Sequence, residues 1–326
     1  MRAYATDRRG PISSLSLRDL PKPAPGAGEL LIKVRAAAPN PADLTVLSGK
    51  GAAPFLHDSR FPLVPGHDFS GVVEQLGAGV SNHAVGDEVF GFLPYSRRTH
   101  QGSFADYLTA HAGTLAKKPK GLSHEEAAGA ATVALTALQS LRDKAHLQPG
   151  QSVLINGASG GVGSYAVQIA KLLGGKVSAI ASGAREEAVR ALGAEAFYDY
   201  KKTRLAARKG EPDALGEPFD VIFDAVSNSS FSACAPWLKP SGAYVTLLLS
   251  KDLLLGKLRS LLSSKGCHFV VVEPRPADLS QLASWFEEGK LKPVLERAYP
   301  LEELPAALER MKRGDVRGKL AITVAA

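Results

Sequence analysis

The chain has 326 residues, enough for two domains, and its 45% hydrophobic and 22% charged residues are ordinary for a globular protein. Its net charge is +7, but the basic residues are scattered in pairs, with one short cluster, KKPK. This scatter disfavours nucleic-acid binding, and a surplus of positive charge equally suits a small anionic ligand.

The first residues, MRAYATDRRGPISSLSL, contain charges and lack the apolar core of a signal peptide. Apolar runs elsewhere are too short for a membrane span. We therefore expect a cytoplasmic protein with no membrane partner. The two cysteines, Cys234 and Cys267, lie in apolar surroundings and are expected to be buried, reduced thiols.

The first part of the chain is rich in glycine, proline and short alternating runs. Strands are predicted at 29–38, 69–77 and 87–93, which indicates an all-β or barrel-like domain. Ser123, followed by two glutamates at 125 and 126, predicts the start of a helix, because a capping residue and early acids are typical there.

Beyond this point apolar strands alternate with helical patterns, which predicts a parallel sheet covered by helices on both faces. The predicted strands lie at 152–157, 176–182, 219–227, 242–250 and 267–273. A helix at 301–314 and a last strand at 319–326 follow, while 93–102 and 250–260 are expected to be pocket-lining loops.

If 267–273 is an edge strand, two copies could pair there as a homodimer. A capped edge and a monomer are the alternative.

The stretch VLINGASGGVGSYAVQIAKLLG, residues 153–174, carries glycines between a predicted strand and a predicted helix. Its spacing is A-x-G-x-x-G, at Ala158, Gly160 and Gly163. Small residues allow a tight turn and let a pyrophosphate touch the backbone at the helix N-terminus. In this strand–loop–helix context the motif favours a dinucleotide site over a simple turn. The expected binding residues of the loop are Ala158, Ser159, Gly160, Gly161, Val162 and Gly163.

The next predicted strand distinguishes between the two nicotinamide cofactors. An NAD site usually carries an acid about 20 residues past the glycines, but Ser182 stands there and Arg185 follows. A hydroxyl and a guanidinium suit a 2′-phosphate, so NADPH is expected in preference to NADH. The alternative is that Arg185 is a solvated residue in the first turn of a helix.

The motifs together resemble the medium-chain dehydrogenase/reductase superfamily, in its zinc-free branch of NADPH quinone oxidoreductases and enone reductases. The similar segments are PGAGELLIKVRAAAPNPADLTVLSGK, PLVPGHDFSGVVEQLGAGV, GDEVFGF, GSFADYL, GASGGVG, LGAE and GKLAIT. The resemblance implies an α/β protein with a Rossmann-type doubly wound parallel sheet and a GroES-like β-barrel. It implies a GroES-like catalytic domain of residues 1–122 and 291–326, a Rossmann domain of residues 123–290, and an active site between them.

The resemblance also bears on metal binding. Zinc-dependent relatives hold the metal with a cysteine in the NPAD region, a histidine in the GHD region and a third ligand. Here Asn40 replaces the cysteine and His67 remains, so no metal is expected.

Several site residues are implied by the resemblance. Asn40 is expected beside the nicotinamide and the substrate, and Asp43 and His67 are candidate proton donors, with solvent as the alternative. Thr45 stands where some bacterial relatives carry a tyrosine acid. The other residues expected to bind the cofactor are Thr136, Tyr200 near the 2′-phosphate, Ala225, Val226 and Lys319.

The expected activity is hydride transfer from NADPH to a quinone or to the C=C bond of an α,β-unsaturated carbonyl. Two alternatives remain open: an enoyl-thioester reductase, and a non-catalytic NADPH-binding sensor or structural protein. The presence of Asn40 favours an enzyme.

Overall fold

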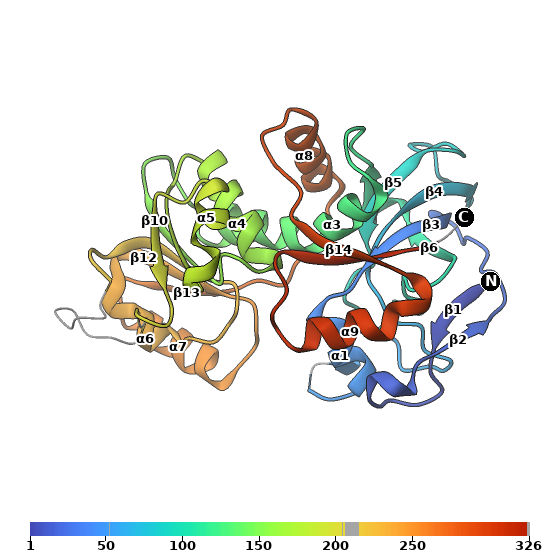
Figure 1. Ribbon diagram of the computed structural model, residues 1–326, viewed down its shortest axis with the longest axis horizontal. Helices are drawn as coiled ribbons and strands as arrows, with labels where there is room; N and C mark the ends of the chain where they lie inside the picture. Colours follow the sequence, from blue (N-terminus) through green and yellow to red (C-terminus); the bar gives the residue numbers. More distant parts are fainter. Residues whose placement is uncertain (52, 204, 206–214, 325–326) are drawn as a thin grey trace. The chain divides into compact units, whose positions relative to one another are not determined.

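The computed structural model describes residues 1–51, 53–203, 205 and 215–324, and the chain forms two compact units (Figure 1). Unit 1 combines Met1–Leu135 with the chain from Glu273 onward, and unit 2 is Thr136–Val272. The long helix α3 (His124–Leu138) begins in unit 1 and ends in unit 2. The domain boundaries expected after residues 122 and 290 stay a prediction.

Unit 1 is built on a mostly antiparallel sheet with the strand order β14-β15-β3-β4-β5-β7, in which β6 also pairs with β3. A separate hairpin joins β1 (Arg2–Ala5) and β2 (Ser16–Asp19). The strands of the larger sheet are β3 (Glu29–Ala38), β4 (Asp68–Leu76), β5 (Glu88–Phe92), β6 (Tyr107–His111), β7 (Leu115–Lys117), β14 (Leu295–Pro300) and β15 (Lys319–Thr323). The expected barrel-like, GroES-like fold is confirmed.

Strand β3 is the centre of unit 1. It pairs with β4 along one edge, while its other edge meets β6 first and β15 near its end. Seven of its ten residues are buried, because neighbours cover both of its faces. Its last residue, Ala38, pairs with Asp68, so the turn after β3 lies beside the start of β4.

The helices of unit 1 lie between and after these strands (Figure 1). Besides the start of α3, they are α1 (Pro41–Ser48), α2 (Ala53–Leu56), α8 (Pro276–Glu287) and α9 (Leu304–Lys312). Helix α9 buries Leu304, Ala307 and Leu308 in the hydrophobic core of the unit, at helical spacing.

Unit 2 contains a parallel sheet with the order β10-β9-β8-β11-β12-β13. Numbered within the unit this is 3-2-1-4-5-6, the order of a doubly wound dinucleotide-binding fold, which confirms the prediction. Its strands are β8 (Ser152–Asn156), β9 (Lys176–Ala181), β10 (Ala196–Asp199), β11 (Phe219–Asp224), β12 (Leu238–Thr246) and β13 (Gly266–Phe269).

The helices of unit 2 pack on this sheet. Helix α4 (Gly161–Leu172) contacts β8 and β9, α5 (Glu186–Ala191) contacts β10, α6 (Phe231–Cys234) contacts β12, and α7 (Lys251–Leu261) contacts β13. As predicted, both cysteines are buried free thiols. Among the described residues, no helix is long and apolar enough to cross a membrane.

The structure corrects one expectation from the sequence. Residues 250–260, taken as a loop, form most of α7. Its ends carry ordinary helix signals, since the Ser250 side chain accepts a hydrogen bond from the Leu253 N–H and Arg259 lies in the last turn.

Candidate functional site

The glycine loop of unit 2 joins β8 to α4 in a very close turn. Gly157 has φ +80°, in the region that favours glycine. Gly163 lies against this turn, and a Cβ atom on it would stand 2.0 Å from the Gly157 carbonyl oxygen. Only a residue without a side chain allows α4 to approach β8 so closely.

The space beside the first residues of α4, next to the same turn, is not filled by any other described part of the chain. Gly160 is the N-cap of the helix, and a Cβ atom on it would meet only the Gly157 carbonyl oxygen, at 3.4 Å. Ser159, Gly160, Gly161 and Val162 are all partly exposed. Bare backbone, free space and the N-terminal end of a helix dipole fit the pyrophosphate of a dinucleotide.

A buried aspartate organises the neighbouring strand end. Asp224, the last residue of β11, accepts hydrogen bonds from the Asn156 amide at 2.8 Å, from two backbone N–H groups and from the Tyr244 hydroxyl. The Ala225 N–H donates to the Asn156 carbonyl at 3.1 Å. Val226 is 51% exposed, and its side chain lies so near Gly157 that a Cβ atom there would clash. Ala225 and Val226 thus border the glycine loop, at the point where the strand order reverses.

The ends of β9 and β10 bring together the residues expected near a 2′-phosphate. The strands pair up to Asp199 and Ala181, and the Tyr200 N–H donates to the Ala181 carbonyl at 3.1 Å. Ser182 and Arg185 are half-buried and Tyr200 is exposed. One acid is also present, since the Asp199 carboxylate lies near Gly183 and accepts the Lys201 N–H.

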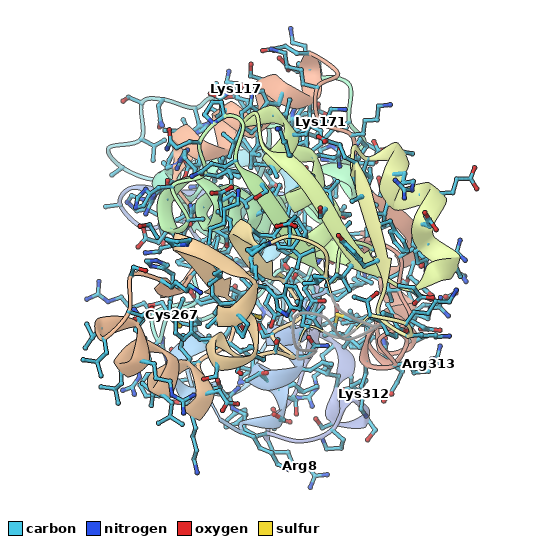
Figure 2. All side chains as sticks on the ribbon, turned by 90° about the vertical axis from the view of Figure 1, so that its left-hand side faces the viewer. Arg8, Lys117, Lys171, Cys267, Lys312 and Arg313 are labelled. Carbon is cyan, nitrogen blue, oxygen red and sulfur yellow. The ribbon has the colours of Figure 1, made fainter. Side chains whose placement is uncertain are left out.

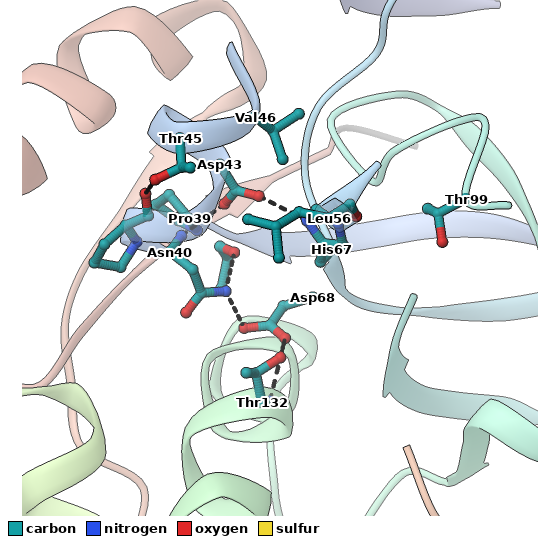
Figure 3. Close-up of polar contacts among 12 residues, drawn as sticks. Pro39, Asn40, Asp43, Thr45, Val46, Leu56, His67, Asp68, Thr99 and Thr132 are labelled. Carbon is teal, nitrogen blue, oxygen red and sulfur yellow. Dashed lines mark hydrogen bonds and ion pairs between the residues drawn. The ribbon is translucent and has the colours of Figure 1, made fainter. Parts of the chain in front are cut away.

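The polar centre of unit 1, by which we mean Asn40, Asp68, Thr132 and Lys319, forms where β3, β4, α3 and β15 meet. Figure 3 shows Asn40, Asp68 and Thr132 with the hydrogen bonds that join them. The Lys319 ammonium donates to the Asn40 Oδ1 atom and to the Pro39 carbonyl, each at 2.7 Å. The Asn40 Nδ2 atom donates to Asp68 Oδ2 at 2.8 Å. A cation therefore holds one end of the Asn40 amide, and an anion holds the other.

The charges of this centre are buried as a pair. Asp68 is fully buried, Lys319 is 5% exposed, and their charged atoms lie 3.6 Å apart. Burial raises the pKa of Asp68 and lowers the pKa of Lys319, while the attraction between the two groups opposes both shifts. Thr132 adds hydrogen bonds to Asp68 Oδ1 from its backbone N–H, at 3.1 Å, and from its hydroxyl.

A second buried pair fixes the backbone of Asn40. The Asn40 N–H donates to Asp43 Oδ2 at 2.7 Å, in a capping box at the start of α1. The other oxygen of Asp43 lies 2.9 Å from His67 Nδ1. His67 Nε2 faces the Leu56 carbonyl at 3.4 Å, so both ring nitrogens face oxygen atoms. Through these contacts Asp43 and His67 stabilise the turn that contains Asn40.

Two further aromatic rings surround His67. The centroid of the Tyr95 ring lies 4.5 Å from the centroid of the His67 ring. The Tyr95 hydroxyl forms a hydrogen bond with Thr132. Burial and the carboxylates of Asp43 and Asp68 raise the pKa of Tyr95 well above its usual value. The His57 ring meets His67 edge-on at 5.8 Å, and burial lowers the pKa of His57 to about 4.

The donor set of this centre does not fit a catalytic zinc ion. An amide stands where a thiolate would be needed, both nitrogens of His67 are engaged, and the Lys319 ammonium occupies the space beside Asn40. Within the described ranges, no group of three His, Cys, Asp or Glu side chains could hold a metal ion.

The predicted site residues thus form separate groups. Asn40, Asp43, His67 and Lys319 come together in unit 1, while the glycine loop gathers with Ala225 and Val226 in unit 2. Thr136 is buried in α3, one helical turn after Thr132. Sequence reasoning missed Asp68, Thr132 and Tyr95. An acid at the start of a buried strand was the signal for Asp68, and a threonine on the same helical face as Thr136 was the signal for Thr132.

Comparisons with known proteins agree with the GroES-like fold of unit 1 and the nucleotide-binding fold of unit 2. Residues 26–120 match the alcohol dehydrogenase GroES-like domain, and residues 192–322 match the zinc-binding dehydrogenase family. The solved structure of the quinone oxidoreductase from Coxiella burnetii is 31% identical, with a TM-score of 0.89 over 100% of this chain and 99% of that one.

Three curated relatives cover most of the chain. The mitochondrial NAD(P)H oxidoreductase RTN4IP1 of Homo sapiens is 35% identical, with 91% of this chain and 82% of the relative covered. The 2-methylene-furan-3-one reductase of Solanum lycopersicum is 32% identical, with 99% and 79% covered. The chloroplastic quinone-oxidoreductase QR1 of Triphysaria versicolor is 31% identical, with 99% and 98% covered.

These names contradict the cytoplasmic location expected from the sequence. Two of the three relatives are named as mitochondrial or chloroplastic proteins, and these names do not support a cytoplasmic location. The expectation was wrong because it rested on the lack of an apolar signal peptide. Proteins enter these organelles with amphipathic, arginine-rich transit peptides, which have no such core.

The glycine loop can be tested with a matched pair of substitutions. We expect Gly163→Ala to lower the free energy of unfolding by about 1–3 kcal/mol, because its Cβ atom would overlap the Gly157 carbonyl. Gly160→Ala should change it by about 0.5 kcal/mol or less, since its Cβ atom meets an ordinary contact. Urea unfolding followed by circular dichroism measures both. Equal effects of the two substitutions would contradict the described approach of α4 to β8.

His57 predicts how stability depends on pH. Its pKa is 6.5 in the unfolded chain and about 4 in the folded protein, so between these values only the unfolded chain is protonated there. The free energy of unfolding should therefore fall as pH falls, by about 2 kcal/mol from pH 7 to pH 5 through this group. Urea unfolding at both pH values measures it. His57→Phe should remove this part of the decrease, and His100→Gln, at an exposed site, should leave it intact.

Proposed function

The chain belongs to the medium-chain dehydrogenase/reductase superfamily and is an NAD(P)H-dependent oxidoreductase, and we propose that it uses NADPH and works without zinc. We propose a quinone, or the C=C bond of an α,β-unsaturated carbonyl, as the hydride acceptor. The observation that carries this proposal is the Asn40 amide clamped between the Lys319 ammonium and the Asp68 carboxylate. The names of the relatives support the acceptor classes.

Several features support a dinucleotide in unit 2. The glycine loop leaves bare backbone and free space at the start of α4, where a pyrophosphate can accept hydrogen bonds from N–H groups. Ala225 and Val226 border this loop at the reversal of strand order. When bound, the cofactor supplies the hydride, and the protein's part is to place it and to shape the surrounding field.

The choice of NADPH rests on the ends of β9 and β10. Ser182 and Arg185 follow β9, and Tyr200 and Lys201 follow β10 at the adjacent strand end. A hydroxyl, a guanidinium and an ammonium suit a 2′-phosphate. The Asp199 carboxylate would repel a 2′-phosphate, but its Oδ1 atom already accepts a hydrogen bond from the Lys201 backbone N–H.

The polar centre of unit 1 provides a hydrogen-bond donor for the developing negative charge of the substrate oxygen. One N–H of the Asn40 amide is committed to Asp68, and the amide nitrogen is 3.5 Å from the Ala38 carbonyl, a weak contact that leaves the second N–H able to donate. The Lys319 ammonium on Oδ1 polarises the amide and strengthens that N–H as a donor. A fixed donor in a buried setting stabilises an oxyanion without reorganisation.

Protonation of the product requires a proton donor. Asp43 and His67 are engaged with each other and with the turn around Asn40, which leaves them as supports in this proposal. Tyr95 keeps its phenolic proton at physiological pH, because its pKa is raised. Solvent is the proton source we propose, since a quinone or a stabilised enolate needs little acid help.

The activity is tested by following NADPH absorbance with a quinone, an enone and a crotonyl thioester in parallel. We expect oxidation with the quinone or the enone. Oxidation only with the thioester would move the assignment to an enoyl-thioester reductase. Tight NADPH binding without any consumption would indicate a non-catalytic binding protein.

Arg185 should decide the preference between the two cofactors. Arg185→Ala removes a charge-assisted contact to the 2′-phosphate and should weaken NADPH binding about tenfold to a hundredfold. NADH binding should stay unchanged, because NADH lacks that phosphate. Fluorescence titration of both cofactors measures this. Arg190→Ala is the control, since Arg190 pairs with Glu186 on the same segment. Equal weakening of both cofactors by Arg185→Ala would refute the assignment.

Lys319 should act on turnover rather than on cofactor affinity. Lys319→Met frees one end of the Asn40 amide and leaves Asp68 buried without its cation, so kcat should fall about tenfold or more. The Kd for NADPH should stay within about twofold. The double variant Lys319→Met/Asp68→Asn restores neutrality if the single variant folds poorly. Stopped-flow turnover and fluorescence titration measure the two quantities. A large change in Kd would instead assign Lys319 to cofactor binding.

A further inference from the structure

Tyr95 lies beside the polar centre of unit 1, in the segment that joins β5 to β6. The centroid of its ring lies 4.5 Å from that of the His67 ring and 5.8 Å from that of the Phe92 ring. The Leu93 N–H donates to the His67 carbonyl at 2.9 Å, which attaches the start of this segment to the residue before β4. Two ring contacts and a nearby backbone hydrogen bond thus hold the Tyr95 ring in place.

The Tyr95 hydroxyl begins a chain of hydrogen bonds that ends on Asp68. It is hydrogen-bonded to Thr132, whose hydroxyl is in turn hydrogen-bonded to Asp68 Oδ1, a contact visible in Figure 3. A hydroxyl has one proton to donate, and an ionised carboxylate can only accept. Thr132 therefore gives its proton to Asp68, and its oxygen accepts the proton of Tyr95. The chain has a single direction, from Tyr95 through Thr132 to Asp68.

Asp68 depends on such contacts because it has no exposed surface. Its side chain is fully buried, and its cation, Lys319, is 5% exposed. By contrast, the surface cations Arg8 and Lys312 extend into solvent in Figure 2. A buried acceptor that loses a partner is destabilised, because water cannot replace the missing hydrogen bond. Each contact to the Asp68 carboxylate therefore helps to determine its orientation.

The two oxygens of Asp68 have different partners. Oδ1 accepts the Thr132 backbone N–H at 3.1 Å as well as the Thr132 hydroxyl. Oδ2 accepts the Asn40 amide at 2.8 Å and lies 3.6 Å from the Lys319 ammonium. Because the carboxylate is rigid and planar, the contacts on Oδ1 also set where Oδ2 holds the Asn40 amide.

We propose that Tyr95 is a positioning residue of the reductase. Through the chain that ends on Asp68, its hydroxyl fixes the Asn40 amide, whose second N–H meets the substrate oxygen. This inference rests on the proposed function, in which Asn40 is the donor to that oxygen. Burial and the carboxylates of Asp43 and Asp68 raise the pKa of Tyr95, so the phenol keeps the proton that it donates.

The chain is tested with substitutions that each remove one hydroxyl. Tyr95→Phe keeps the ring, and kcat with the quinone or the enone should fall about twofold to tenfold, the range for one neutral hydrogen bond. Thr132→Val should lower kcat about tenfold to a hundredfold, because it removes a hydrogen bond to a charged group. Thr132→Ser keeps a hydroxyl and should retain most of the activity. The Kd for NADPH should stay within about twofold in all three.

The double variant Tyr95→Phe/Thr132→Val distinguishes a chain from two separate effects. Thr132→Val already disconnects Tyr95 from Asp68, so the double variant should have the same kcat as Thr132→Val alone. The control is Tyr4→Phe, which removes the hydroxyl of another buried tyrosine of unit 1, bonded to the Glu302 carbonyl at 2.8 Å. It should leave kcat unchanged.

Two kinetic results would overturn the proposal. One is an unchanged kcat in Tyr95→Phe, a result that does not depend on whether Thr132→Val folds. The other is a loss of kcat by the same factor when Tyr95→Phe is made alone and in the Thr132→Val background, which would show that the two hydroxyls act independently.

Urea unfolding of the same variants tests the chain without turnover. Tyr95→Phe should lower the equilibrium constant for folding about twofold to tenfold in the wild-type background, and should not lower it in the Thr132→Val background. Equal losses in both backgrounds would overturn the chain. A wild-type protein that consumes no NADPH with a quinone or an enone would instead refute the proposed function, and Tyr95 would then have no reaction to support.

Discussion

The ion pair between Lys319 and Asp68 is the constraint on which the candidate chemistry depends. Two opposite charges are removed from water in unit 1, and each is satisfied only because Asn40, Thr132 and the Pro39 carbonyl complete its hydrogen bonds. Such a pair adds little stability compared with apolar residues of the same size, yet loss of one partner leaves a costly buried charge. The ion pair instead fixes the orientation of the Asn40 side chain. The amide cannot flip while the Lys319 ammonium holds its oxygen and the Asp68 carboxylate holds its nitrogen.

The glycine loop of unit 2 obeys a different constraint, which is steric rather than electrostatic. Gly163 permits the approach of α4 to β8, and Gly160 leaves the space in front of it open. Asp224 then ties the ends of β8 and β11 together through Asn156. Both candidate sites thus stand beside strand ends, where the sheet fixes the backbone and leaves side chains and N–H groups available.

Much of this could be predicted from the sequence, because local patterns determine local structure. The strand at 29–38 has the predicted bounds, and the strand–glycine–helix order identified the nucleotide fold before its topology was known. The polar centre could not be derived in this way. Lys319 and Asn40 are 279 positions apart, and no spacing rule brings them together. Asp68 is hidden in an apolar strand, and α7 was missed because its exposed leucines resemble neither a buried helix nor a polar surface helix.

The discontinuous path of unit 1 has a consequence for how the protein is made. A ribosome releases unit 2 as one uninterrupted stretch, so its sheet can form while synthesis continues. The barrel must wait, because β15 emerges last and is the strand that completes the edge of β3. Until then Asp68 has no counter-ion from Lys319. A nascent chain that stalls just short of β15 would carry a finished nucleotide fold beside an open barrel, a species that chaperones would need to hold soluble.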